Sequence, residues 1–386
     1  MKIVVNLVRA IVGILFIVSG LVKANDPLGL SYKMQEFFEL WNTSLSSSKF
    51  FLARPLMALF EYFHDQSLML SVIMIALEIL AGAALLLGWQ KKLILRSLLV
   101  LIVFFTFLTA YAYLSGKFKN CGCFGDCLPI TPLTSFLKDI ALLVFIVFLL
   151  FTQRYIEPLF TNAGRRFFML CALALSVGLQ WYVLNYLPLV DCLPFKKGNN
   201  ISQQMKIPAG ALPDSFAIRF VYEKGGKQFE FSPETLPADL ATYKYVDRVD
   251  KLVRKGQAEA PIKGFSLTGA TADSTEIVLN QPNALLVICD VFKDSKSRLS
   301  DLQNIRAAAQ QKKIPVYVVT SASIPFVTNI LNNNGLGDIQ VFSCDNTAVR
   351  TAARTNPTFY LIRQGTIISK YSYCQAGKTI ADLKKQ

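Results

Sequence analysis

Three cysteines fall within one short run, Lys119-Asn-Cys121-Gly-Cys123-Phe-Gly-Asp126-Cys127, and a fourth, Cys192, follows the last apolar segment of the chain. Gly122 and Gly125 permit the sharp turns that bring closely spaced sulfur atoms together. A Cys-x-Cys disulfide between Cys121 and Cys123 would be strained, and strained disulfides are the labile kind that takes part in exchange. Cys127 and Cys192 would then be a second pair that exchanges with the first.

Two other roles for these cysteines stay open. Cys127 and Cys192 can simply fasten the loop to the end of the last apolar segment, as a structural disulfide. Zinc binding is the third role, but the spacing differs from the usual Cys-x2-4-Cys pattern, and the single histidine, His64, lies in another loop. We therefore expect no metal site.

The surroundings of the cysteine loop favour thiolate chemistry. Lys117 and Lys119 are positive charges of the kind that stabilise a thiolate. Thr131 and Pro132 predict a helix start, with Thr as the cap, so the positive end of the helix dipole would face the loop. Asp139, two turns into that helix, is a candidate proton acceptor; the alternative is a helix-packing network together with Lys138.

The composition places half of this chain in a membrane. Of its 386 residues 53% are apolar and only 17% charged, with a mean hydropathy of +0.39, whereas soluble proteins carry about 25% charged residues. Disorder is excluded by the same apolar content. Segments of about 20 apolar residues can cross a bilayer as helices. Five such segments are predicted, at about 3–22, 67–88, 93–115, 133–152 and 167–187.

Basic residues in the short turns predict the orientation. Lys91 and Lys92 follow the second segment, and Arg154, Arg165 and Arg166 follow the fourth. Such turns face the cytoplasm. The amino terminus would lie on the same side, and the cysteine loop and everything after residue 187 on the periplasmic side, where disulfides persist. A further apolar run, from Phe50 to Phe63, is expected to form an interfacial helix.

Two charges fall inside predicted spans. Glu78 lies near the middle of the second segment, where a carboxylate is costly unless it is paired or protonated. Arg9 on the first segment is expected at a comparable depth, so the two residues are predicted to form an intramembrane charge pair.

The first half resembles a known family. Arg9, Gly13, Lys23 and the run from Asp26 to Gly29 are similar to the first helix of the bacterial DoxX family, and Glu78 with Gly82 to its second helix. The Cys-Gly-Cys-Phe-Gly segment at 121–125, followed by Thr-Pro and Lys-Asp, resembles the MauE branch, the methylamine-utilisation membrane proteins.

This resemblance implies a helical membrane bundle linked to thiol or quinone redox chemistry in the envelope. A quinone is accordingly a candidate cofactor, and a periplasmic protein a candidate partner, while nothing indicates methylamine as a substrate. We expect no nucleic-acid partner.

The second half predicts an α/β layer fold. Strands are expected at Ala284–Cys289, Pro315–Thr320, Pro357–Ile362 and Thr366–Tyr371, alternating with helices. The segment from Asp345 to Ile362 resembles a thioredoxin-like domain, in which Pro357 would be the cis-proline. Upstream, a hairpin is predicted around Lys-Gly-Gly-Lys, and the basic stretch Arg248 to Lys255 is predicted to form an amphipathic helix.

The thioredoxin-like resemblance fails at the active site. Where a Cys-x-x-Cys should follow the first strand, the chain reads Asp290-Val-Phe-Lys-Asp-Ser, and Cys289 is expected to be buried as a small hydrophobe. The predicted organisation is a DoxX/MauE-like membrane domain (1–190), a linker with a hairpin (191–260) and a thioredoxin-like domain (261–386) that docks a partner. Two functions fit: inner-membrane thiol–disulfide exchange, or a non-enzymatic assembly factor with structural disulfides.

Overall fold

The computed structural model describes most of the chain. Cys121 and Cys123 lie outside the described part, so their exchange remains a prediction. The described residues are 1–47, 51–116, 127, 130–211, 215–233, 235–237, 239–254, 256, 259–269, 272–290 and 296–386.

Among the described residues, five helices are long and apolar enough to cross a membrane, which confirms the predicted spans. Local signals set their ends: Thr131 caps α6 by accepting a hydrogen bond from the Thr134 amide, and α4 ends at Gly88, whose φ of 67° is readily adopted by glycine. The helices are α1 (Lys2–Ala24), α4 (Ser67–Leu87), α5 (Lys91–Ser115), α6 (Pro132–Phe151) and α7 (Asn162–Tyr186).

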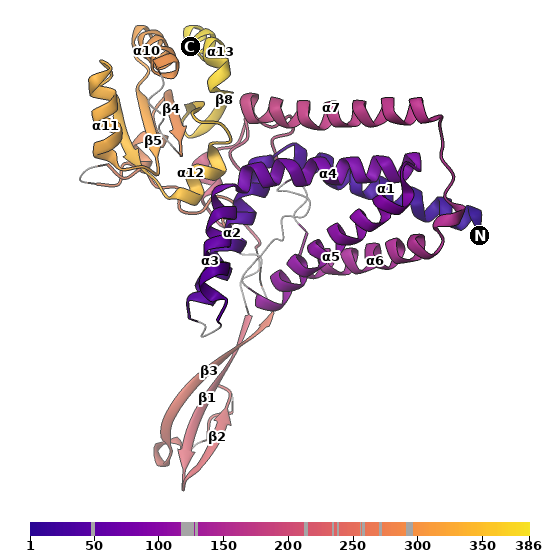
Figure 1. Cartoon of the computed structure of the whole chain (residues 1–386). Helices are drawn as coiled ribbons and strands as arrows, with labels where there is room; N and C mark the ends of the chain where they lie inside the picture. Colours follow the sequence, from indigo (N-terminus) through magenta and orange to yellow (C-terminus); the bar gives the residue numbers. More distant parts are fainter. Residues whose placement is uncertain are drawn as a thin grey trace.

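The spanning helices form two closely packed pairs, α1 with α4 and α5 with α6. Glycines bring the first pair into backbone contact, since a Cβ atom on Gly82 would lie 2.8 Å from the Gly13 carbonyl oxygen. A buried cluster that includes Phe16, Leu85 and Ile146 joins the two pairs. Helix α7 lies along the flank formed by α1 and α4, and the short helix η1 (Gln153–Tyr155) precedes it (Figure 1).

Two further helices, α2 (Pro27–Ser46) and α3 (Ala53–Asp65), run crosswise to the spanning helices at one end of the bundle (Figure 1). We call this the domain end, because the α/β domain lies beside it; the other end holds the amino terminus. An aromatic cluster formed by Phe38, Trp41, Phe60, Phe107 and Tyr111 packs α2 and α3 against α5. A helix within the run Phe50 to Phe63 was predicted; its interfacial position stays a prediction.

A three-stranded arm extends from the domain end, away from the α/β domain (Figure 1). It consists of β1 (Ser215–Lys224), β2 (Lys227–Phe231) and β3 (Lys244–Arg254), in the order β2-β1-β3, with the short helix η2 (Leu240–Thr242). Gly225 and Gly226 both have positive φ, as a tight hairpin turn requires. This confirms the predicted hairpin.

The prediction of an amphipathic helix from Arg248 to Lys255 is wrong, because residues up to Arg254 belong to β3. The strand pairs antiparallel with β1 over most of its length, with Tyr222 opposite Tyr245. Aromatic and β-branched residues from Tyr243 to Val249 favour a strand, and the ladder to β1 satisfies their backbone groups. The prediction of a helix relied on the basic residues of this stretch and gave no weight to its strand-forming residues.

The last part of the chain is an α/β domain with a five-stranded mixed sheet, ordered β6-β5-β4-β7-β8. Strands β4, β5 and β6 are parallel, β7 runs antiparallel to β4, and β8 pairs antiparallel with β7. The sheet confirms a fold of thioredoxin-like type. Its strands are β4 (Ala284–Cys289), β5 (Val316–Thr320), β6 (Gln340–Ser343), β7 (Thr358–Arg363) and β8 (Thr366–Ser372).

Helices cover both faces of this sheet, and each face has its own apolar core. One core contains Phe195 and Phe265 from the connecting segment, so the chain just after α7 is part of this domain. The helices of this region are α8 (Ile201–Gln204), α9 (Thr275–Leu279), α10 (Lys296–Gln311), α11 (Ile324–Asn333), α12 (Asn346–Ala352), η3 (Tyr373–Gln375) and α13 (Ala376–Lys385).

Candidate functional site

A disulfide joins Cys127 to Cys192 at the domain end of the bundle, with the two Cα atoms 4.9 Å apart. It links the loop between α5 and α6 to the segment that follows α7, across 65 residues of sequence. This is one of the pairings that the sequence left open. The bond fixes Cys127, which precedes α6, beside the end of the last spanning helix.

Asn25, which caps α1, holds the segment next to the disulfide. Its Nδ2 donates to the Val190 carbonyl oxygen at 2.8 Å, and its Oδ1 accepts from the Val190 amide at 3.0 Å. Asp191 then pairs with Lys370 of β8, Oδ2 to Nζ, at 2.8 Å. Burial lowers the pKa of Lys370, and the neighbouring Asp191 carboxylate opposes that shift. The disulfide is therefore held by both the bundle and the α/β domain.

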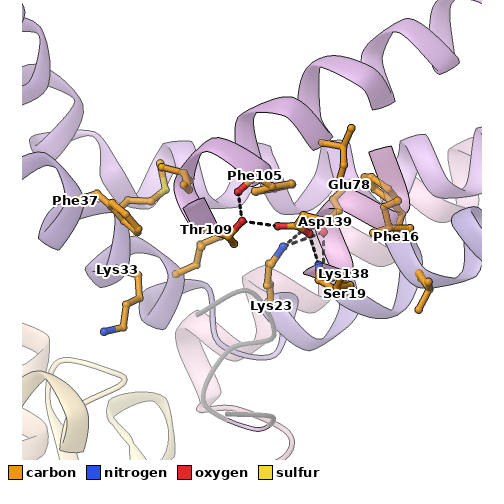
Figure 2. Close-up of a pocket in the computed structure, with 16 residues that line it drawn as sticks. Phe16, Ser19, Lys23, Lys33, Phe37, Glu78, Phe105, Thr109, Lys138 and Asp139 are labelled. Carbon is orange, nitrogen blue, oxygen red and sulfur yellow. Dashed lines mark hydrogen bonds and ion pairs between the residues drawn. The ribbon is translucent and has the colours of Figure 1, made fainter. Parts of the chain in front are cut away.

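A cavity lies within the bundle at its domain-end half, among α1, α2, α4, α5 and α6 (Figure 2). The empty space between its lining atoms is about 720 Å³, including the part that is open to the surroundings. Most of its wall is apolar, and five charged side chains line the rest. The lining includes Phe16, Lys23, Lys33, Phe37, Glu78, Phe105, Thr109, Lys138 and Asp139.

The first polar group in this cavity is built by α1 and α4. Lys23 Nζ lies 2.9 and 2.7 Å from the two carboxylate oxygens of Glu78, and Ser19 Oγ donates to Glu78 Oε1 at 2.8 Å. Both charged side chains are only 4% exposed. The Lys23 ammonium also lies 4.5 Å from the centre of the Phe105 ring. A buried charge needs such close pairing.

The second polar group comes from α5 and α6. Asp139 is fully buried; its Oδ1 lies 2.6 Å from Lys138 Nζ, and Thr109 Oγ1 donates to its Oδ2 at 3.0 Å (Figure 2). Glu78 and Asp139 thus face one cavity, each beside a lysine and a hydroxyl.

The predicted pair between Arg9 and Glu78 is wrong. Arg9 donates from Nε to the Leu85 carbonyl at 2.7 Å, from Nη1 to the Glu157 carbonyl at 2.9 Å, and from Nη2 to the Leu86 carbonyl. Because α1 and α4 are antiparallel, Arg9 meets the carboxyl end of α4, whose last carbonyls lack partners within the helix. Lys23, 14 residues and about 21 Å further along α1, is the partner of Glu78.

Sequence reasoning missed Lys23, Ser19 and Thr109 as cavity residues. The signal was present for Lys23, since antiparallel packing of α1 on α4 through Gly13 and Gly82 places the end of α1 beside Glu78. Within the described residues, no group of three His, Cys, Asp or Glu side chains lies close enough to hold a metal ion. Most of the cysteine loop falls outside that search.

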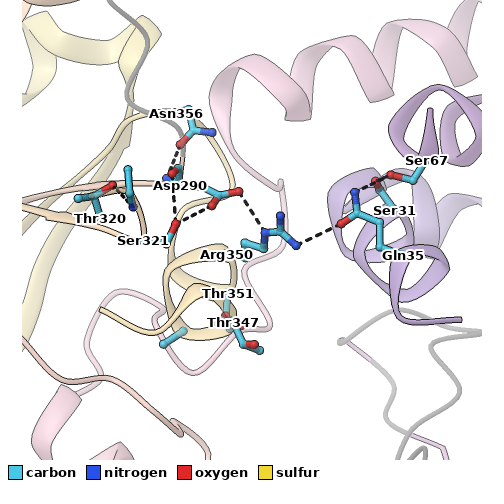
Figure 3. A network of polar contacts seen from close by, with 12 residues as sticks. Ser31, Gln35, Ser67, Asp290, Thr320, Ser321, Thr347, Arg350, Thr351 and Asn356 are labelled. Carbon is cyan, nitrogen blue, oxygen red and sulfur yellow. Dashed lines mark hydrogen bonds and ion pairs between the residues drawn. The ribbon is translucent and has the colours of Figure 1, made fainter. Parts of the chain in front are cut away.

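The active-site edge of the α/β domain carries a polar network in place of thiols (Figure 3). The bond between Asn356 and Pro357 is cis, as predicted. Asn356 Oδ1 accepts from the Asp290 amide at 2.8 Å, and the Asp290 carboxylate accepts from Ser321 Oγ at 2.8 Å. Cys289 is buried, and burial raises the pKa of its thiol to about 12. That thiol is inert in the native state.

Two segments of the chain match known protein families. Residues 1–152 match the family described as methylamine utilisation protein MauE, and residues 216–255, the arm, match a domain of unknown function. Protein TlpB of Flavobacterium psychrophilum is 30% identical over 133 residues, which is 34% of this chain and 33% of TlpB. The chain therefore spans about a third of the length of this relative. No solved structure matches.

These findings establish a MauE domain over residues 1–152, and they identify the chain as a bacterial membrane protein. The α/β domain that follows is of thioredoxin-like type by its sheet.

Proposed function

We propose that this protein takes part in thiol–disulfide redox chemistry of the bacterial envelope, or in the maturation of periplasmic proteins, with Cys121 and Cys123 as the exchanging pair. The disulfide between Cys127 and Cys192 carries the proposal. In sequence, Cys123 and Cys121 precede Cys127 by only four and six residues. A stable disulfide at this position also indicates an oxidising compartment.

The proposed chemistry is exchange between two sulfur pairs. A thiolate attacks one sulfur of a disulfide and forms a mixed disulfide, which a second thiol then resolves. One dithiol thereby becomes a disulfide, losing two electrons and two protons, while the other pair is reduced. Periplasmic thiols would be the donors, and Cys121 with Cys123 would pass their electrons on.

The proposed orientation follows from charge. At the end of the bundle opposite the α/β domain, Lys91 begins α5, Arg154 lies in η1, and Arg165 lies in the first turn of α7. Basic turns face the cytoplasm. The protein would then lie in the inner membrane, with its amino terminus cytoplasmic and its disulfide and α/β domain periplasmic.

The cavity supports a quinone as electron acceptor. Its apolar wall and its depth in the bundle suit a lipid-soluble ring, and Phe105 and Phe37 suit ring contacts. Lys23 and Lys138 can donate hydrogen bonds to oxygen atoms, and Glu78 and Asp139 can hold protons. A bound quinone would supply a sink for two electrons and two protons. Asp139, buried and two turns into α6, would hold a proton between Thr109 and Lys138.

The α/β domain would serve as a docking module for a periplasmic protein. Without cysteines after β4 it cannot carry out dithiol exchange at its own active-site edge. It is instead fastened beside the disulfide, through Lys370 and Asp191. A docked partner would therefore be held near the cysteine loop.

Replacement of the proposed exchanging pair tests this function. We expect both Cys121→Ser and Cys123→Ser to leave envelope thiols reduced in cells; the variant that lacks the cysteine bonded to the substrate should form no mixed disulfide, and the variant that lacks the resolving cysteine should accumulate it. Cys171→Ser, on an exposed position of α7, should change neither readout. Alkylation followed by non-reducing electrophoresis measures both. Unchanged envelope disulfides in both loop variants would refute the proposal.

A second function is an assembly factor with structural disulfides only. The absence of thiols at the Asp290 edge favours it. Under this alternative, Cys121→Ser and Cys123→Ser would keep full function and the same co-purifying partners, and only the variants of Cys127 or Cys192 would lose them.

A further inference from the structure

Helix α2 is shared between the two halves of the molecule. One of its faces, formed by residues at helical spacing, lines the cavity: Leu30, Lys33, Met34 and Phe37. The other side, with Asp26 at its cap, Tyr32 and Gln35, contacts the α/β domain. Helix α2 therefore lies between the cavity and that domain.

A buried ion pair joins α2 to the α/β domain at its first turn. Arg354 Nε lies 2.9 Å from Asp26 Oδ2, and the two side chains are only 4% and 13% exposed. The other oxygen of Asp26 accepts from the Gly29 amide at 3.0 Å. One carboxylate thus caps α2 and receives the arginine, so the position of the helix and the contact between the domains depend on the same group.

A second arginine, Arg350, extends the contact between α2 and the α/β domain. Arg350 Nη1 donates to Gln35 Oε1 at 3.2 Å, while its Nε pairs with Asp290 at 3.1 Å (Figure 3). The guanidinium groups of Arg350 and Arg354 lie 5.1 and 5.5 Å from the centre of the Tyr32 ring. The pKa of Tyr32 is raised, and burial is the main cause. The phenol therefore stays neutral beside both guanidinium groups.

This contact involves the edge of the α/β domain that would carry a thioredoxin-type active site. Asp290 directly follows β4, where the thiol pair is missing, and its amide donates to Asn356 next to the cis-proline. Arg350 belongs to α12, and Arg354 follows it on the way to the same proline. The residues of this edge are therefore engaged with the membrane domain.

From these contacts we propose that the cis-proline edge is a protein-binding surface whose occupant is the segment from Asp26 to Gln35 of the same chain, and that this contact keeps α2 closed over the cavity. A protein that competes for Arg350 and Arg354 with an acidic or amide-bearing segment would release α2. The domain end of the cavity would then open. The proposal does not depend on which molecule the cavity binds.

Site-specific labelling of the cavity tests the proposal. The reporter is Leu142→Cys, a buried cavity position on α6, in the full chain in nanodiscs, treated with a small charged methanethiosulfonate reagent; peptide mass spectrometry separates it from the native cysteines. We expect Arg354→Glu to raise the labelling rate roughly tenfold, within the usual range of coupling between sites. Asp26→Asn, which removes the charge but keeps a side-chain oxygen that can cap α2, should raise the labelling rate as well.

The matched control is Arg306→Glu, which breaks the more exposed pair of Arg306 and Asp338 in the same domain and should leave labelling unchanged. Retention of the disulfide between Cys127 and Cys192 reports folding. If Arg354→Glu prevents folding, Arg350→Gln replaces it and should raise labelling by a smaller factor. An unchanged labelling rate in a folded variant of Arg354 or of Asp26 would overturn the proposal. The labelling rate and the retained disulfide both report on structure, so they do not depend on the proposed exchange by Cys121 and Cys123.

Discussion

The membrane bundle and the α/β domain divide fold and chemistry between them. The bundle has a simple packing of apolar helices, but it holds two ion pairs in a cavity and a disulfide at its end. The α/β domain has the complete mixed sheet and cis-proline of its type, yet it has Asp290 in place of a thiol pair. A fold can thus be complete although the residues of its usual reaction are missing, so function must be argued from the site.

The largest expected effect lies in the bundle. Glu78→Gln removes one partner of a buried pair and leaves the Lys23 ammonium uncompensated, which should cost about 3–5 kcal/mol of unfolding free energy. Equilibrium unfolding in mixed micelles measures it. The control is Glu157→Gln in the exposed pair with Lys2, where no measurable change is expected. Equal losses in both variants would show that the cavity charges do not depend on pairing.

The double variant Lys23→Met with Glu78→Leu sharpens the same point. Because both charges are removed together, it should recover most of the stability that Glu78→Gln loses. Apolar replacement at the cavity should at the same time abolish any binding that depends on these polar groups.

The second effect concerns the bond that joins the two regions. Cys127→Ser with Cys192→Ser opens a crosslink that spans 65 residues, and we expect a loss of about 2–4 kcal/mol. A reductant should lower the thermal midpoint of the wild type to that of the double variant and leave the variant unaffected. A wild-type midpoint that is insensitive to complete reduction would contradict a stabilising role.

The smallest effect tests whether the α/β domain lacks thiol chemistry. Burial raises the pKa of Cys289 to about 12 and that of Cys344 to about 11, from an ordinary 9.0. Both thiols should resist alkylation at pH 8 until the protein unfolds, while exposed Cys374 reacts. Labelling with peptide mass spectrometry measures this. Rapid labelling of Cys289 in the folded protein would contradict its inert role.

The raised pKa values of Cys289 and Cys344 also predict how the stability of the α/β domain changes with pH. A thiol whose pKa is raised in the folded state favours folding while it is protonated. This contribution is complete below about pH 9 and is lost as the pH rises towards 12, so denaturant midpoints should fall across that window. Cys289→Ala should reduce the fall.

Much of this architecture was predictable from local pattern. Apolar runs fixed the five spans, and Thr131 with Pro132 marked the start of α6. Continuous apolar strands, such as Ala284–Cys289, indicated a sheet covered on both faces. These features depend on residues close together in the sequence, where periodicity and capping are strong signals.

The errors arose where distant segments meet. Arg9 was assigned to Glu78 because both are charges in spans, but the antiparallel register of α1 and α4 pairs Glu78 with Lys23. The stretch from Arg248 to Lys255 was predicted to be a helix from its charges, but pairing with β1 makes the residues up to Arg254 part of a strand. The contact of Arg354 with Asp26 spans 328 positions in sequence, and no local pattern carries it.

The packing of the spanning helices in two pairs has a mechanical consequence. The ion pair of Lys23 with Glu78 lies within the α1–α4 pair, and that of Lys138 with Asp139 lies within α6 of the α5–α6 pair. The boundary between the pairs runs through the cavity and is crossed there by the Lys23 ammonium over the Phe105 ring. Neither salt bridge crosses that boundary, so a displacement of one helix pair relative to the other would leave both salt bridges intact.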